Sequence, residues 1–348
     1  MEKNEGSCSI LRSLNLDNIE EVVSEVYHQV GAGRPPRKPI GIFKALIVKR
    51  VKQIPSDREL YRLWYDQDLR EVCDIEAEQK PYHPTQMTRF RNRVGVERLE
   101  RIMNCLVSEL LKGRLIIGKI VVMDATFIKA YSKRDIHENG CGGADPQARV
   151  GRNGKTFELG YKLHIAVDAK SELPLAFIAA PANDNEKKHA SALLEKTLKA
   201  TKRGVRLVIA DSQYSSRNLR DMASSQGVRV VIPFPANQMR DQKGLLRVDR
   251  YFRTHGPKGE KRLYRLRSSV ERVNSRLKEQ LCLEKHRVRS LERITVHALI
   301  CMIAMLLNAV AAFRLNRVEK ARSITLLATE TKHKKVKLAT HWRAKERA

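Results

Sequence analysis

Two near-continuous apolar runs, each closed by an aspartate, constrain the fold of this chain more than any other feature. IIGKIVVMD ends at Asp124, and VRLVIAD ends at Asp211. Apolar runs without polar alternation are typical of strands that are buried on both faces, and such strands need helices on both sides of their sheet. The chain is therefore predicted to contain a mixed α/β sheet in which two central strands each end at a carboxylate.

The other expected elements complete a five-stranded sheet. YKLHIAVD and LPLAFIAA, separated by a turn-like tetrapeptide, predict an antiparallel hairpin, and VRVVIPF predicts the last strand. Helices are expected at Glu186–Ala200 and Ser216–Gln226. The Gly-rich polar stretch Ser132–Lys155 is expected to be a long loop. Asp168 also ends a strand, but the hairpin turn that follows explains it.

A helix that carries a further carboxylate is expected after the sheet. Four polar residues fall on one helical stripe, within an arc of about 60° at about 100° per residue, opposite an apolar face. The stripe consists of Tyr264, Arg267, Glu271 and Lys278, and the apolar face of Leu266, Val270, Val273, Leu277 and Leu281. Taken alone, such a helix is most often an ordinary solvated surface helix. Packed on the sheet, it can present Glu271 beside the two aspartates.

The three carboxylates together indicate a metal-dependent phosphoryl-transfer site. A right-handed crossover can place the strand of Asp211 parallel to that of Asp124, about 4.8 Å away, so that the two share a metal ion. Oxygen-only ligation with Glu271 suits Mg²⁺ or Mn²⁺, and a pair of such ions can drive an in-line displacement at phosphorus. Arg267 and Lys278 would neutralise phosphate charge, and Tyr264 would stack on a base or hydrogen-bond a phosphate. Singly, either aspartate is more often a turn or cap residue.

The charge balance favours nucleic acid as the partner. Lys and Arg outnumber Asp and Glu by 67 to 39, a net charge of +28, which attracts polyanions. The sequence shows neither a lipidation signal nor a secretory h-region, and the apolar stretch Ala298–Leu307 is shorter than a bilayer span of about 20 residues, so a buried core helix and no membrane partner are expected. The six cysteines form no C-x-x-C pair, which indicates a cytoplasmic protein without a zinc site.

Basic residues near the N-terminus are candidates for DNA contacts. Seven Lys or Arg and no acid lie between Arg34 and Lys52, and we assign four of them mainly to phosphates: Arg34, Arg37, Lys38 and Lys44. A helix after Pro84, with Thr85 as its cap, carries three candidate readers of base edges: Arg89, Arg91 and Arg93. A basic solvated helix is the alternative. The expected division is a helical DNA-binding domain at 1–113, the catalytic domain at 114–313 and a basic tail at 314–348.

These motifs resemble the DDE transposases of bacterial and archaeal insertion sequences. The resemblance rests on Tyr264-x2-Arg267-x3-Glu271-x6-Lys278, with Met-Asp-Ala-Thr around Asp124 and Ala-Asp-Ser-Gln-Tyr around the second aspartate. It implies an RNase H-like catalytic domain behind a helical DNA-binding domain. It also implies Mg²⁺-dependent strand cleavage and strand transfer at terminal inverted repeats, with the three carboxylates as the triad. Double-stranded DNA, as transposon ends and as target, is the implied partner of a homodimer on the nucleoid.

The chain departs from that family at two places, and two other functions stay open. Gln213 stands where relatives often carry Gly or Ala, and the interval from Pro235 to Tyr264 is too short for the large β-rich insertion that some relatives have. A nuclease with the same metals would cut without joining strands, and a catalytically inactive repressor would only bind DNA. Cleavage with Mg²⁺ excludes the repressor, and a joined product excludes the simple nuclease.

Overall fold

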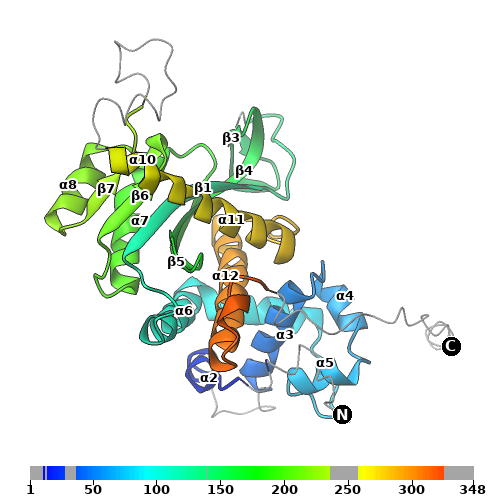
Figure 1. Ribbon diagram of the computed structural model, residues 1–348. Coiled ribbons are helices and arrows are strands. Elements are labelled where there is room, and N and C mark those ends of the chain that lie inside the picture. The colour runs from blue at the N-terminus through cyan, green and yellow to red at the C-terminus, as the bar shows by residue number, and fades with distance from the viewer. Residues whose placement is uncertain (1–10, 12–13, 28–36, 139, 236–257, 325–348) are drawn as a thin grey trace.

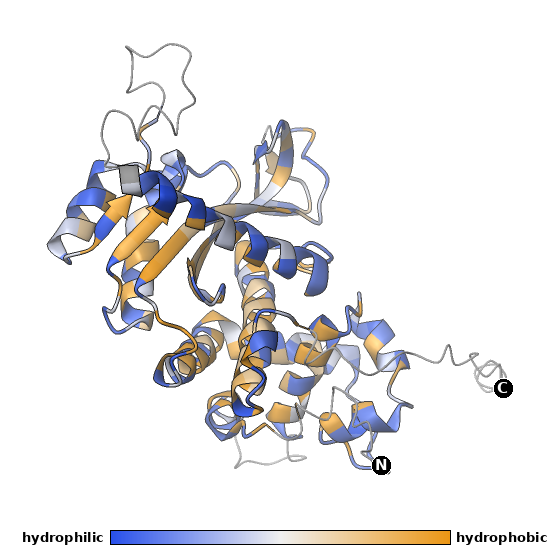
Figure 2. Ribbon diagram, in the orientation of Figure 1, coloured by the Kyte–Doolittle hydropathy of each residue, from blue (hydrophilic) through white to orange (hydrophobic). Residues whose placement is uncertain are grey.

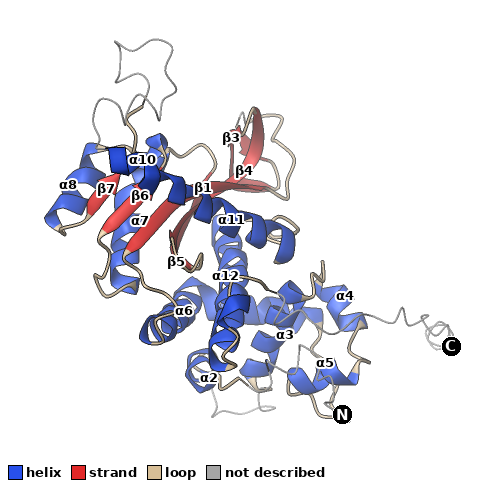
Figure 3. Ribbon diagram, viewed as in Figure 1, coloured by secondary structure: helices blue, strands red, loops and turns tan. Residues whose placement is uncertain are grey.

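A seven-stranded sheet and a group of helices, joined by one long helix, form the protein (Figures 1 and 3). The computed structural model describes residues 11, 14–27, 37–138, 140–235 and 258–324. Five of the strands form the core of the sheet, in the order β5-β4-β1-β6-β7. Their bounds are β1 Ile120–Lys129, β4 Thr156–Asp168, β5 Pro174–Pro181, β6 Leu207–Ala210 and β7 Arg229–Val231.

The pairing of these five strands is that of an RNase H-like sheet. β1 runs antiparallel to β4, and β4 runs antiparallel to β5. β6 runs parallel to β1, and β7 runs parallel to β6. A meander of three antiparallel strands therefore continues into two parallel ones, reached through helical crossovers. The predicted fold, a mixed five-stranded core sheet with helices, is confirmed.

The prediction of a long loop at 132–155 is wrong. This stretch forms β2 (Cys141–Gly142) and β3 (Asp145–Asn153), so the complete sheet has seven strands. β4 has room for both neighbours because β3 pairs with its first half, up to Gly160, whereas β5 pairs with its second half, from Tyr161 onward. β3 lies beyond the helices, and only three of its nine residues are buried. Its polar, Gly-rich composition therefore looked like that of a loop.

Helices cover the core strands. α7 (Glu186–Ala200) packs on β4 and β5, whereas α11 (Ser268–Ser275) packs on β1 and β4. α8 (Arg217–Ser225) packs against β7 and α7. The side chains of 121–123 in β1 and 208–210 in β6 are completely buried, and both strands are strongly hydrophobic in Figure 2. The expectation of two central strands buried on both faces is therefore confirmed.

The N-terminal helices share their core with the sheet through α12 (Leu291–Arg314), which runs from the sheet to the helices at the other end of the molecule in Figure 1. α12 packs mainly against α6 and also against α3. It is long and apolar enough to cross a membrane, but 94% of its most apolar window is buried inside the protein, as expected of a core helix. The N-terminal helices are α2 Asp17–Ser24, α3 Pro39–Val51, α4 Asp57–Arg62, α5 Gln67–Val72 and α6 Pro84–Lys112.

Local sequence signals start the helices of this region. Ser56 caps α4, and its hydroxyl accepts a hydrogen bond from the Glu59 amide at 3.1 Å. The predicted cap of α6, Thr85, is wrong, because His83 holds that position and Gln86 bonds back to its amide at 2.9 Å. Gly95 (φ 65°) interrupts α6 and separates a short basic first part from the longer buried part.

Candidate active site

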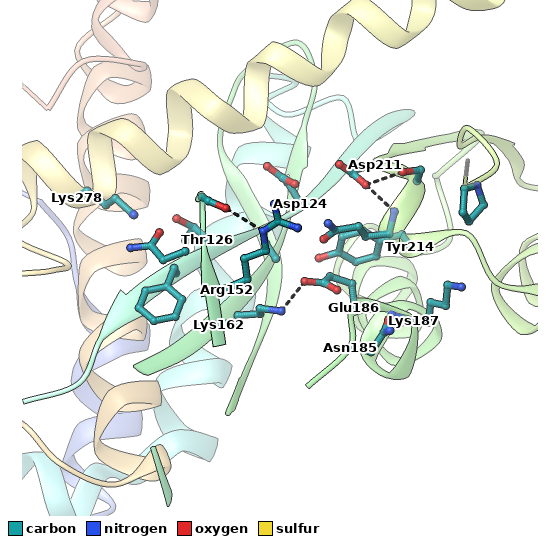
Figure 4. A pocket seen from close by; sticks show the side chains of 17 residues that line it. Asp124, Thr126, Arg152, Lys162, Asn185, Glu186, Lys187, Asp211, Tyr214 and Lys278 are labelled. Atoms are coloured by element: carbon teal, nitrogen blue, oxygen red, sulfur yellow. Dashed lines mark hydrogen bonds and ion pairs between the residues drawn. The ribbon is translucent and has the colours of Figure 1, made fainter. Parts of the chain in front are cut away.

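Strand register brings Asp124 and Asp211 together. Met123 of β1 pairs with Ala210 of β6 in the parallel ladder, so the next residue on each strand is an aspartate. Both line one cleft of about 840 Å³ and lie near each other at its edge in Figure 4. The two strand-end carboxylates therefore face the same space, as the crossover argument predicts.

The two aspartates have different surroundings. The Asp124 side chain is 19% exposed, and burial raises its pKa to about 6, opposed by the charge of Arg267 and reinforced by the other two carboxylates. The Asp211 carboxylate caps the short helix η1 (Ser212–Tyr214) and accepts a hydrogen bond from the Gln213 amide at 2.5 Å. The charge of Asp124 is thus not fully compensated, whereas Asp211 is held in place by the backbone that follows it.

The glutamate helix is present, but it is not one regular helix. α10 (Lys258–Tyr264), the 3₁₀ turn η3 (Arg265–Arg267), α11 and the π-helical turn η4 (Arg276–Gln280) follow each other. Four members of the predicted apolar face are completely buried, and the fifth, Leu266, packs on the same core. The predicted packing is therefore confirmed, although the changes of helical pitch alter the spacing along the polar side.

Arg267 connects two of the three carboxylates. Its Nη2 lies 2.6 Å from Oε1 of Glu271, and its Nη1 lies 3.6 Å from Oδ1 of Asp124. Burial raises the pKa of Tyr264 to about 12. The charge of Arg267 opposes this shift, and the charges of the three carboxylates add to it. At neutral pH its phenol therefore keeps its proton and can donate a hydrogen bond. The carboxylates surround one positively charged group.

The carboxylate oxygens suit a hard divalent cation, although they are not arranged around a common position for one. Among the described residues, no three His, Cys, Asp or Glu side chains lie close enough together to hold a metal ion as they stand. The positively charged guanidinium of Arg267 lies between Asp124 and Glu271, where a metal ion would otherwise balance their charge. Glu271, with 53% of its side chain exposed, can turn, and carboxylate oxygens alone fit Mg²⁺ or Mn²⁺. The residues therefore fit the expected metal.

Lys278 lies at a different part of the cleft. It comes from the π-helical turn η4 and lines the cleft with Asp124, but its ammonium pairs with Glu284 at 2.6 Å. Figure 4 shows Lys278 well apart from Asp211. A phosphate would have to replace Glu284 as its partner.

Several other charged groups line the cleft and belong to none of the motifs described above. Lys162 of β4 donates to Glu186 at the start of α7 at 2.7 Å, and Arg152 comes from β3 (Figure 4). Glu186 is a fourth carboxylate, and Lys162, with 14% of its side chain exposed, compensates its charge. No sequence motif links Lys162 and Glu186, because they lie on different elements and are 24 residues apart.

His164 and Asp168 are buried and hydrogen-bonded inside the fold. His164 is buried and its Nδ1 lies 2.9 Å from the hydroxyl of Tyr214, while burial lowers the pKa of the imidazole to about 3. Asp168 is buried, and it accepts hydrogen bonds from the Gly118 amide at 2.8 Å and from the amide and hydroxyl of Ser171. The strand-end aspartate with satisfied oxygens is thus the structural one.

The predicted DNA-contacting residues of α6 lie on two faces. Arg89 and Arg93 are exposed and line one hollow, and the guanidinium of Arg93 stacks on Tyr27 at 5.0 Å. Arg91 points the other way and pairs with Asp57 at 2.6 Å. Two arginines therefore remain candidates for reading bases, whereas the third joins α6 to α4.

The predicted phosphate contacts near α3 also differ from one another. Arg34 lies outside the described residues. Lys38 is exposed, and the guanidinium of Arg37 lies 5.4 Å from the centre of the Tyr82 ring. Lys44 is buried and its ammonium pairs with Asp74 at 2.8 Å, so its charge is already used inside the fold. Of the three described residues, Lys38 is the most accessible to a phosphate.

The fold and the clustered carboxylates define a class: RNase H-like proteins with an acidic centre at the ends of two adjacent parallel strands. A family model described as a transposase DDE domain matches residues 117–307. A second model, described as a transposase domain, matches residues 3–93. The chain belongs to the DDE transposase family.

Comparisons with other proteins add little to this assignment. No curated protein matches the chain. A piggyBac transposase synaptic complex with hairpin DNA is 10% identical, with 96% of this chain and 80% of that one covered and a TM-score of 0.41. The Mos1 transposase catalytic domain, solved with Raltegravir and Mg, is 16% identical, with 51% and 92% covered and a TM-score of 0.21. These scores are too low to support an argument about function.

Proposed function

We propose that this protein cleaves DNA at the terminal inverted repeats of an insertion sequence and joins the freed ends to a target, in a reaction that depends on Mg²⁺ or Mn²⁺. The observation that carries the proposal is the meeting of Asp124, Asp211 and Glu271 around Arg267, in a chain of the DDE transposase family. We further propose that the active complex is a homodimer on the nucleoid in the cytoplasm.

The three carboxylates would hold the metal, which would activate the attacking oxygen and stabilise the leaving one. Asp211 is already oriented by the Gln213 amide, whereas Glu271 would leave Arg267 to join it. Arg267, once released, can pair with a backbone phosphate, because its planar fork matches phosphate oxygens. Tyr264 keeps its proton and can donate it in a hydrogen bond to the same backbone.

The cleft also has cations that can hold a strand near the carboxylates. Lys278 lines one part of it and Arg152 another. Lys162 is not available in the same way, because Glu186 accepts its hydrogen bond. The carboxylates are therefore surrounded by cations. Such cations would attract the DNA backbone and offset the repulsion between its scissile phosphate and the carboxylates.

The test is incubation of the protein with the DNA that flanks its own gene and Mg²⁺, with every cut mapped. We expect cuts at the inverted repeats and a joined product. Asp124→Asn, Asp211→Asn and Glu271→Gln should each remove nearly all cleavage, yet bind DNA as well as before or better, because one negative charge near phosphate is lost. The matched control is Asp221→Asn, on the exposed side of α8.

Each alternative function has its own result. Cuts without any joined product would indicate a nuclease, and binding without cuts would indicate a repressor. Substantial cleavage by any of the three triad variants would remove that carboxylate from the mechanism.

A further inference from the structure

A second cleft, which we call the basic cleft, lies between the N-terminal helices and the segment that leads into α12. Its volume is about 590 Å³, and seven Lys or Arg but only two acids line it. The main contributors are Lys49 and Arg50 of α3, Arg91 of α6, and Lys285, Arg287 and Arg293. No part of the carboxylate site lies in it.

Arg50 is the unusual residue of the basic cleft. It is only 5% exposed, and its Nε has no hydrogen-bond partner. In the part of the chain that the structure describes, no acid forms an ion pair with it. Of the two acids that line the cleft, Asp57 is already paired with Lys49 at 2.6 Å and with Arg91 at 2.6 Å, and Glu292 is exposed. A buried guanidinium without an anion is unfavourable, so this position is one that an anionic ligand would stabilise.

Two histidines beside Arg50 do not supply the missing negative charge. The Nε2 of His286 lies 3.0 Å from the Lys129 carbonyl, and the Nε2 of His297 lies 2.9 Å from the Leu283 carbonyl. Because a carbonyl can only accept, each Nε2 carries the proton of the neutral imidazole. Burial lowers the pKa of both imidazoles and the charge of Arg50 lowers it further, although the hydrogen bond to the Lys129 carbonyl opposes this for His286, so both imidazoles are neutral at pH 7.

The outer part of the cleft continues this positive charge into solvent. Lys285, Arg287 and Arg293 are exposed, and none has an ion pair among the described residues. The same segment is fixed to the end of β1, where His286 bonds to Lys129 and the guanidinium of Arg289 donates to the Tyr131 carbonyl at 3.1 Å. β1 also carries Asp124, so one strand links the basic cleft to the carboxylate site.

We propose that the basic cleft is a second DNA-binding site, in which a backbone phosphate pairs with Arg50 while Lys285 and Arg287 contact flanking phosphates. The proposal rests on the proposed function, because it takes the ligand to be the duplex on which the carboxylates act. Arginine is suited to this role, since its guanidinium donates to two phosphate oxygens at once. The contact is with the backbone, so it positions DNA and does not read its sequence.

The experiment measures binding of the full chain to flanking duplex and to random duplex, in EDTA and at several salt concentrations. Arg50→Met should weaken binding to both duplexes alike, roughly tenfold, and reduce the salt slope by about one. The double variant Lys285→Gln with Arg287→Gln should reduce the slope by about two. The matched control, Arg217→Gln on α8, alters a side chain that is 92% exposed and should change neither quantity.

Thermal unfolding separates a ligand-binding role of Arg50 from a structural one. Arg50→Met should melt at the wild-type temperature or above it, because an unpaired buried charge is removed; a clear fall in melting temperature with an unchanged salt slope would overturn the proposal. Pyrophosphate should raise the melting temperature of the wild type but not of Arg50→Met.

The outcomes distinguish this proposal from the function on which it rests. If the Arg50 and Lys285/Arg287 variants bind DNA like the Arg217 control, the second site is refuted while the proposed function stands. If the wild type binds neither duplex, the proposed function fails. Pyrophosphate stabilisation that depends on Arg50 would then show a site for a small phosphate ligand instead of DNA, which also overturns the proposal.

Discussion

Asp57 is a single carboxylate on which the packing of three helices depends. It lies at the start of α4, with its side chain 14% exposed, and pairs with Lys49 of α3 at 2.6 Å and with Arg91 of α6 at 2.6 Å. Asp57→Asn keeps the shape and removes the charge. We expect this change to destabilise the N-terminal helices by leaving the buried Lys49 and the partly buried Arg91, with Arg50 nearby, without an anion.

The size of the effect follows from the pKa values. Burial raises the pKa of Asp57, but Arg91 and then Lys49 outweigh it and hold the pKa at about 2, against an ordinary 3.8. At 1.36 kcal/mol per pKa unit, this corresponds to about 2 kcal/mol of stability at neutral pH. Burial and the charge of Arg50 lower the pKa of Lys49 to about 8, so Lys49 is the unfavourable member of the pair. Asp57→Asn should therefore cost about 2–4 kcal/mol, and Lys49→Met little or nothing.

Urea unfolding at pH 7 measures these differences, with Asp221→Asn as the exposed control, which should stay within about 0.5 kcal/mol of the wild type. The pH dependence has a definite sign. Because the folded pKa of Asp57 is depressed, its contribution is complete above about pH 4 and is lost as the pH falls through about 2. Wild-type stability should fall more steeply than that of Asp57→Asn in this window. Equal stability of the two proteins at pH 7 would refute the reasoning.

Four further outcomes are expected. Mg²⁺ or Mn²⁺ should support cleavage, whereas Ca²⁺ should support binding with little turnover because its coordination is longer and looser; activity that survives exhaustive EDTA treatment would contradict this. Arg89→Gln and Arg93→Gln should each weaken binding to the cognate repeat by about 1–3 kcal/mol and change binding to random DNA little. Equal losses on both DNAs in a binding titration would show that the two arginines belong to a solvated basic surface. Arg91→Gln should instead lower the urea midpoint, because its partner is Asp57. Gly160→Ala should lower the melting temperature, at about 1–3 kcal/mol, because a Cβ there would collide with the Ile128 carbonyl; an unchanged melting temperature would show that β4 can shift.

The sequence was sufficient for the central strands because their burial leaves a local signal. The runs ending at Asp124 and Asp211 are apolar throughout, and only a strand that is covered on both faces tolerates this. The first part of α6 shows the limit of the same reasoning. Arg89 and Arg93 are one turn apart and share a face, whereas Arg91 lies on another face, so three arginines in one helix could not all meet one groove.

The partners of buried charges could not be predicted because they are distant in sequence. Lys44 lies in the densest basic run, which favoured a phosphate contact, but its actual partner is Asp74, thirty residues away. Lys162 and Glu186 are a similar pair on different elements. β3 was missed for a related reason: a partly exposed strand leaves no continuous hydrophobic run, and its pairing with β2 and β4 defines it.

The two aspartates and the glutamate differ in how firmly the fold determines them. Asp124 and Asp211 follow paired residues of one parallel ladder, so any sequence that forms this ladder must place them side by side. Glu271 belongs to a helix that only packs on the sheet, and helical pitch changes on both sides of it, in η3 and η4. Its position therefore depends on side-chain packing and on Arg267, which holds it at 2.6 Å. A site built this way has two carboxylates placed by the strand ladder and one that can move, and the movable carboxylate is the one whose present partner, Arg267, is also a candidate phosphate contact.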